Sequence, residues 1–121
     1  MKKVLDGLNL TLEDARNVAL GRMEVEISET AIQRMKEARE LVFALADKDV
    51  PIYGFTTGVG WNKDKKVFGK YFEEYNRNLI YAHCVAVGPE MKEEQVRAVM
   101  LARLNTLLAA RTGIQLEVVE M

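Results

Sequence analysis

The stretch SETAIQRMKEARELVFAL, residues 28–45, decides the fold class of this chain. Its apolar residues recur at steps of three and four, which places them on one face of an α-helix. They are Ala31, Ile32, Met35, Ala38, Leu41, Val42 and Leu45. Ser28 stands at the expected N-cap, and the pattern stops before Pro51. The sequence therefore predicts a helix of about twenty residues here.

Similar reasoning predicts three more helices and one long loop. Thr11 and Asp14 form the sequence pattern of a capping box, and Gly21 is expected to end the helix that they begin. Residues 71–86 and 92–110 read as the next two helices, whereas residues 49–69 show little regular pattern. Residues 4–10 look like a short extended piece with a turn at Asp6-Gly7. We expect a single, mainly α-helical domain over residues 1–121.

Composition excludes several classes of partner. The 121 residues carry 17 Lys and Arg against 18 Asp and Glu, a net charge of -1, so no general attraction to nucleic acid or to a lipid surface is expected. No apolar run reaches the ~18 residues that a membrane span needs. Cys84 is the single cysteine and the N-terminus does not look like a secretory signal, which together predict a cytoplasmic protein.

The loop contains the stretch PIYGFTTGVG, residues 51–60, in which Tyr53 stands beside three glycines. Glycine suits positions where the backbone must adopt φ > 0 or approach another group closely, so this segment could wrap a ligand. A phenol is a poor base near neutral pH unless cations or hydrogen-bond donors stabilise its anion. From the residues alone, a structural role for Tyr53 is favoured over a catalytic one. The stretch lacks the complete glycine pattern of a phosphate-binding or dinucleotide-binding loop.

His83 is the single histidine, and Cys84 adjoins it on the predicted third helix. Neighbours in sequence point to different sides of a helix, so these two residues do not predict a metal site. The simplest interpretation is a half-buried histidine with a satisfied nitrogen and a small core cysteine.

Residues 53–60, Tyr-Gly-Phe-Thr-Thr-Gly-Val-Gly, resemble the Tyr-Gly-x-Asn-Thr-Gly-Phe-Gly block of the aromatic amino acid ammonia-lyases and aminomutases, of which histidine ammonia-lyase is a bacterial member. Further blocks follow in the family's order. They are Leu10–Asp14, Asn78–His83, which resembles Asn-Leu-Ile-x-Ser-His, and Val96–Ala98 with Met100, Arg103, Asn105, Leu107 and Gly113. The resemblance implies the N-terminal helical part of the ammonia-lyase fold, which is similar to that of fumarase and aspartase.

The resemblance also implies functions for individual residues. Tyr53 would be the catalytic base, Gly54 and Gly58 would shape the loop, and Gly60 would lie at the substrate. His83 would face the substrate side chain, and its presence favours histidine as the substrate. The family's reaction removes ammonia from an aromatic amino acid and leaves an α,β-unsaturated acid.

The sequence differs from the family at several positions of these blocks and lacks one of the family's motifs. Thr56 replaces Asn, Val59 replaces Phe and Ala82 replaces Ser. The family builds its electrophile, methylidene-imidazolone (MIO), from Ala-Ser-Gly, but the single serine here, Ser28, precedes Glu29. We therefore expect no MIO in this chain and no activity from the chain alone. We expect self-association or a partner chain that carries the rest of a lyase. The alternative is a non-catalytic helical module of lyase descent, which would act in binding or regulation.

Overall fold

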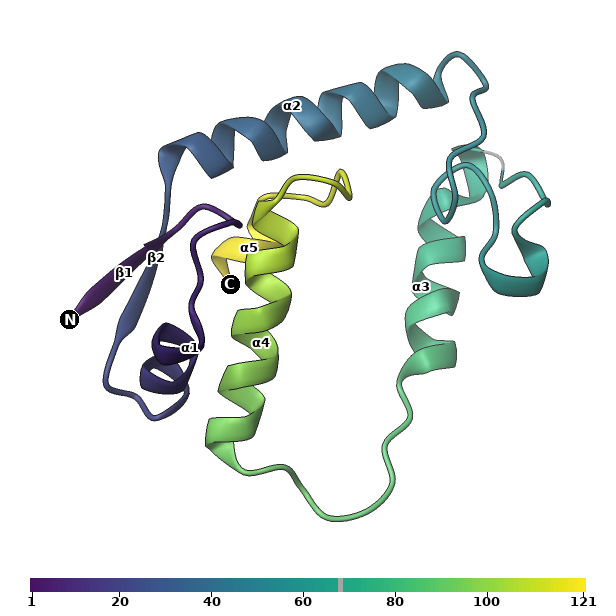
Figure 1. The fold of residues 1–121 in the computed structure, drawn as a ribbon. Helices are drawn as coiled ribbons and strands as arrows, with labels where there is room; N and C mark the ends of the chain where they lie inside the picture. The colour runs from purple at the N-terminus through teal and green to yellow at the C-terminus, as the bar shows by residue number, and fades with distance from the viewer. Residues whose placement is uncertain (68) are drawn as a thin grey trace. The chain divides into compact units, whose positions relative to one another are not determined.

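The structure is a computed structural model that describes residues 1–67 and 69–121. The described residues are mainly α-helical, with one pair of short strands (Figure 1). In chain order the elements are β1 Lys2–Leu5, α1 Leu12–Ala19, β2 Glu24–Ile27, α2 Glu29–Ala46, the 3₁₀ turns η1 Gly60–Asn62 and η2 Gly69–Tyr71, α3 Phe72–His83, α4 Glu93–Leu108 and α5 Glu117–Glu120. They form two compact units, one of residues 1–41 and 90–121 and the other of residues 42–89.

The helices predicted from sequence are confirmed to within a few residues at each end. Helix α2 begins after Ser28, whose hydroxyl accepts a hydrogen bond from the Ala31 N–H at 3.1 Å. The expected capping box of α1 is present, because Thr11 and Asp14 exchange backbone-to-side-chain hydrogen bonds of 3.1 Å each. Helix α3 is shorter than predicted and ends at His83.

The two strands correct the prediction for the N-terminus. Strand β1 pairs in parallel with β2, in a register that runs from Lys2 opposite Glu24 to Leu5 opposite Ile27. The turn after β1 is present, with Gly7 at φ +88°, but residues 8–10 do not continue as a strand. The partner strand comes instead from residues 24–27, where two glutamates alternate with Val25 and Ile27. That alternation places the two apolar side chains against the core of the first unit.

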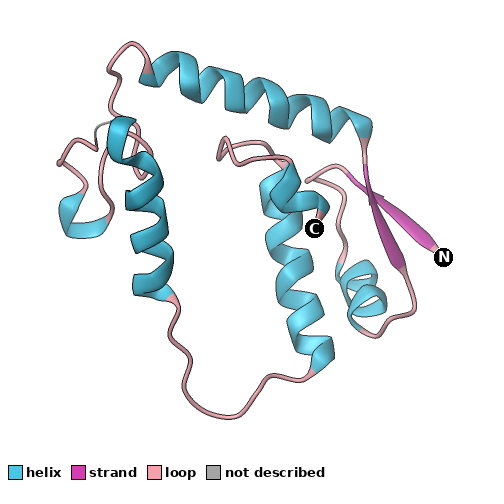
Figure 2. Ribbon diagram, turned by 180° about the vertical axis from the view of Figure 1, so that it is seen from behind, coloured by secondary structure: helices cyan, strands magenta, loops and turns pink. Residues whose placement is uncertain are grey.

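The core of the first unit joins the strands to helices α2, α4 and α5. Its buried residues are Leu5, Ala31, Met35, Leu101, Leu107, Leu108 and Val119. Helix α1 lies beside α4 in both ribbon views (Figures 1 and 2). The turn at Gly7 approaches the end of α4 so closely that a Cβ there would lie 2.5 Å from the Ala109 backbone nitrogen. Glycine is therefore required at this position for close approach as well as for its positive φ.

We expect the charged network around Asp14 to make stability depend on acid pH. Hydrogen bonds from Lys3 and then from Thr11 lower the pKa of Asp14 to about 2, from 3.8 in an unstructured chain. Because the folded pKa is the lower one, the stabilisation is complete above about pH 3.8 and is lost as the pH falls toward 2. In thermal unfolding followed by circular dichroism, Asp14→Asn should lower the unfolding midpoint at pH 7. The midpoint of this variant should also fall less steeply than that of the parent chain as the pH decreases from about 3.8 to 2. Glu13→Gln, at an exposed position of the same turn, is the matched control. A decline in Asp14→Asn as steep as in the parent chain would contradict this assignment.

The second unit has its own small aromatic cluster. The Phe55 ring lies edge-on to Phe43 at 5.3 Å and tilted against Phe72 at 5.4 Å, measured between ring centroids. These contacts join the end of α2, the loop and the start of α3 within this unit. No helix in the described part of the chain is long and apolar enough to cross a membrane.

Candidate active site

The segment between α2 and α3 is largely irregular, as predicted, but hydrogen bonds join residues 56–58 to residues 65–67 at the base of the loop. Thr57 and Lys66 form an isolated antiparallel bridge. The Gly58 N–H donates to the Lys65 carbonyl at 2.9 Å, and the Val67 N–H donates to the Thr56 carbonyl at 2.8 Å. The Lys66 ammonium pairs with Asp49 at 2.6 Å. The loop is therefore a closed structure, which can hold a side chain at its tip in a defined position.

Tyr53 lies at the tip of a tight turn in this loop. The Ile52 carbonyl accepts hydrogen bonds from the N–H groups of three following residues, Phe55, Thr56 and Thr57, at 3.0–3.2 Å. Gly54 follows Tyr53 with φ +72°, a conformation that a residue with a side chain rarely adopts. A Cβ at Gly54 would also come within 3.3 Å of Val59.

The Tyr53 hydroxyl accepts a hydrogen bond from the Gly60 N–H at 3.1 Å. This bond spans seven residues and fixes the end of a side chain that is 66% exposed. The printed bond uses the hydroxyl oxygen as an acceptor, so the hydroxyl can still donate its own hydrogen to a ligand. The structure therefore joins Tyr53 and Gly60, two of the residues that the sequence singled out.

Positions 58 and 60 require glycine for different reasons. A Cβ at Gly58 would lie 2.4 Å from the Asn62 carbonyl oxygen, so no larger residue fits without a backbone shift. Gly60 has φ +55°, but a Cβ there would meet open space. Gly58 is thus needed for close packing of the loop, and Gly60 for backbone conformation.

His83 is the last residue of α3 and is exposed, as is Cys84, so the expected half-buried histidine and core cysteine were wrong. The His83 Nδ1 atom lies 2.7 Å from the Leu79 carbonyl oxygen. A carbonyl can only accept, so Nδ1 is the donor of this bond, and Nε2 is left for a ligand. No hydrogen bond between described residues joins His83 to Tyr53.

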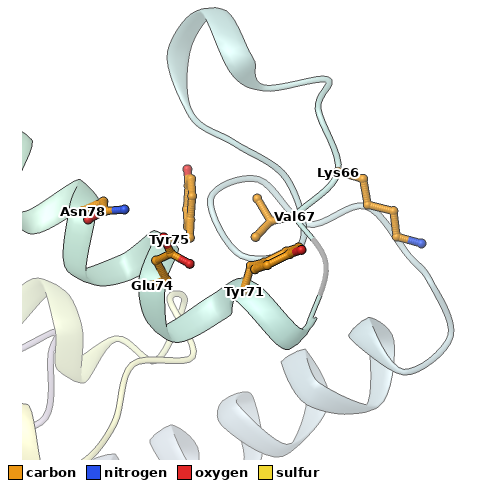
Figure 3. Close-up of a pocket in the computed structure, with 6 residues that line it drawn as sticks. All are labelled: Lys66, Val67, Tyr71, Glu74, Tyr75 and Asn78. Atoms are coloured by element: carbon orange, nitrogen blue, oxygen red, sulfur yellow. The ribbon is translucent and has the colours of Figure 1, made fainter.

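A pocket that the sequence did not predict lies beside the base of the loop (Figure 3). It is open, has a volume of about 380 Å³ and is lined by Lys66, Val67, Tyr71, Glu74, Tyr75 and Asn78. Four of these residues follow the helical spacing of one face of α3 and its preceding turn. Val67 lies between the rings of Tyr71 and Tyr75, whereas the Lys66 side chain points away from them (Figure 3). Neither Tyr53 nor His83 lines this pocket.

The described residues contain no group of three or more histidine, cysteine or acidic side chains that could hold a metal ion. Ser28 is used as the N-cap of α2 and is followed by Glu29. The residues present here therefore do not fit the formation of an MIO group, which the family builds from Ala-Ser-Gly.

Comparison with known proteins agrees with the motifs. The family model "Aromatic amino acid lyase" matches residues 10–121. A histidine ammonia-lyase from Caldanaerobacter subterraneus subsp. tengcongensis is 43% identical, over 99% of this chain and 24% of that protein. The solved structure of ergothionase, an ergothioneine-degrading enzyme from Treponema denticola, matches with a TM-score of 0.93 and 44% identity, over 99% of this chain and 24% of that one. Tyrosine aminomutase from Streptomyces globisporus matches with a TM-score of 0.92 and 33% identity, over 99% and 23%.

The two solved structures share the helical arrangement described above. The chain spans about a quarter of the length of each of the three relatives. The match runs through the capping box of α1, the Tyr53 loop, α3 and α4 without leaving out any of these elements. The chain therefore belongs to the aromatic amino acid lyase family and is homologous to the N-terminal region of histidine ammonia-lyase.

Proposed function

We propose that this chain supplies the Tyr53 loop to the active site of an ammonia-lyase that acts on histidine. The observation that carries the proposal is the accessible Tyr53 hydroxyl, held in place by the Gly60 amide within a closed loop. The 43% identity to a histidine ammonia-lyase over nearly the whole chain supports the choice of substrate.

In this proposal Tyr53 removes a proton from the β-carbon of the substrate. Such a proton is barely acidic, so the base must be positioned accurately, and general-base catalysis contributes roughly 10²–10⁴-fold. The Gly60 N–H points at the phenol oxygen, where negative charge would reside before the transfer. A backbone N–H is a suitable donor for such a charge because it is fixed before the reaction begins.

His83 is proposed to bind the side chain of the substrate. With Nδ1 bonded to Leu79, the free Nε2 can accept a hydrogen bond from the imidazole N–H of histidine. A phenylalanine ring offers no such donor, so His83 should favour histidine over phenylalanine.

The electrophile is proposed to come from another polypeptide segment that contains Ala-Ser-Gly. The same segment, on a partner chain, would complete the site around Tyr53 and His83.

A second candidate substrate is ergothioneine, a betaine derivative of histidine. The observation that favours it is the match to the structure of ergothionase, which is 44% identical to this chain with a TM-score of 0.93. Both carry an imidazole-type ring, which the Nε2 atom of His83 could bind.

The proposal is tested by exchanging His83 for leucine in the complex of this chain with the segment that carries Ala-Ser-Gly. Loss of the hydrogen bond to the substrate ring should lower the ratio of kcat/KM for histidine over phenylalanine by roughly 10–100-fold. The measurement is the rate of unsaturated-acid formation from histidine, ergothioneine, phenylalanine and tyrosine. Cys84→Ala, at the exposed neighbouring position, is the control and should leave the ratio unchanged. A complex that forms but turns over none of these compounds would remove the proposed function.

A further inference from the structure

The hydroxyl of Thr56 is buried and bonded on both sides of its oxygen. Thr56 is 7% exposed, and with Thr57 it makes up the buried polar residues among those that the structure describes. Its Oγ1 atom accepts from the Ile52 N–H at 2.7 Å and donates to the Val50 carbonyl at 3.0 Å. A buried hydroxyl that both accepts and donates is fully engaged with the backbone.

Both partners of this hydroxyl lie within the three residues before Tyr53. The Ile52 carbonyl accepts hydrogen bonds from the N–H groups of residues 55–57, and the Ile52 N–H donates to the Thr56 hydroxyl. Both the carbonyl and the N–H of Ile52 are therefore bonded to residues that follow Gly54. Tyr53 and Gly54 are the two residues enclosed between these bonds. The Thr56 hydroxyl therefore closes the turn from which the Tyr53 side chain projects.

The neighbouring hydroxyl of Thr57 provides a contrast. Thr57 is also buried, at 8% exposure, but its hydroxyl has carbonyl partners, that of Gly58 at 3.0 Å and that of Ile52 at 3.4 Å, and its single hydrogen can point to either. No N–H depends on it as an acceptor in these bonds. Removing it leaves the Ile52 carbonyl with its three N–H donors and takes a donor from the Gly58 carbonyl, which lies beyond the turn that carries Tyr53. Removing the Thr56 hydroxyl instead leaves the N–H of Ile52, the residue directly before Tyr53, without its acceptor.

The other side of the turn is anchored by Phe55, whose ring contacts the rings of Phe43 and Phe72. The backbone at Tyr53 is thus held by the Thr56 hydroxyl and by the Phe55 ring, while the end of its side chain is held by the Gly60 N–H. Three attachments define the position of the phenol, and Thr56 is the one that acts through a single side-chain oxygen.

We infer that Thr56 is a positioning residue that holds the Tyr53 phenol at the substrate, an inference that rests on the proposed function. The bonds of the Thr56 hydroxyl go to the backbone of Val50 and Ile52, so it acts on the phenol through the backbone that carries Tyr53. A displacement of about 1 Å at a reacting group can lower a rate by roughly 10²-fold. Loss of the hydroxyl should therefore reduce turnover more than substrate binding.

The test compares Thr56→Val, Thr56→Ser and Thr57→Val in the complex with the segment that carries Ala-Ser-Gly. Valine keeps the shape of threonine but removes the acceptor, so we expect Thr56→Val to lower kcat by roughly 10–100-fold with KM within about 3-fold of the parent. Serine restores the hydroxyl and should return kcat to within about 3-fold of the parent. Thr57→Val, with the same change at an equally buried neighbour, should lower kcat by less than about 5-fold.

Tyr53→Phe is measured beside these variants so that the two proposals can fail separately. If Tyr53→Phe keeps full activity, the base assignment fails and the positioning role fails with it. If Tyr53→Phe is inactive but Thr56→Val and Thr57→Val behave alike, the proposed function stands and the positioning role is wrong. Should Thr56→Val not fold, Thr56→Ser decides: a folded serine variant with kcat lowered by 10-fold or more would overturn the inference.

Discussion

Replacing Tyr53 by phenylalanine is expected to lower the lyase rate of the completed enzyme by roughly 10²–10⁴-fold, the usual contribution of a general base. The substitution removes one oxygen atom and keeps the ring. The Gly60 N–H loses its acceptor, but that group is exposed and can bond to water. Since the glycines of the loop are unchanged, the loss should fall on catalysis and not on folding.

The rate is measured as the absorbance of the unsaturated acid formed from histidine. Tyr71→Phe is the matched control, because the Tyr71 ring, over which the Lys70 ammonium lies at 4.8 Å, is kept by phenylalanine. We expect this control to retain activity within about 3-fold of the parent. A Tyr53→Phe complex that is as active as the Tyr71→Phe control would remove Tyr53 from the mechanism.

The second large effect is expected for Gly58→Ala, with a loss of roughly 10²-fold in kcat. The added Cβ would lie 2.4 Å from the Asn62 carbonyl oxygen and 2.8 Å from its Cβ, so the backbone must move. That movement would displace η1, which contains the Gly60 N–H that holds the Tyr53 hydroxyl. The phenol would lose its alignment although it is chemically intact.

Gly60→Ala is the control for this prediction. Its Cβ would meet open space, and alanine keeps the N–H, so the cost is the strain of φ +55°, about 1–2 kcal/mol. We expect kcat to fall by less than about 10-fold, with thermal unfolding and kcat measured for both variants. A larger loss of kcat in Gly60→Ala than in Gly58→Ala would show that close packing at Gly58 does not control the position of Tyr53.

The sequence was sufficient where one local pattern determines the structure. The apolar spacing of α2 and the capping box of α1 gave their positions, because helix periodicity and capping depend on residues a few positions apart. Strand β2 was missed although Glu24 to Ile27 alternate, since four residues are a weak signal and their partner lies more than twenty positions away.

For the candidate site, the sequence predicted which residues take part but not their hydrogen bonds or their exposure. Gly54 and Gly58 were expected to shape the loop, and the positive φ of the first and the tight packing of the second give physical reasons for this. The bonds of the Thr56 hydroxyl could not be predicted, because they depend on how the loop closes on itself. The exposure of His83 and Cys84 was missed for a similar reason: helical spacing shows which residues share a face, but not which face is covered.

The most direct test of the account is the formation of unsaturated acid from histidine in three samples. They contain this chain alone, the segment that carries Ala-Ser-Gly alone, and the two combined, with complex formation checked by size-exclusion chromatography. We predict product only in the combined sample, because the residues of this chain include Tyr53 but no Ala-Ser-Gly, and the proposal takes the electrophile from the other segment. Product from this chain alone, or a stable complex that yields none, would contradict the account, and the second result would favour a non-catalytic module of lyase descent.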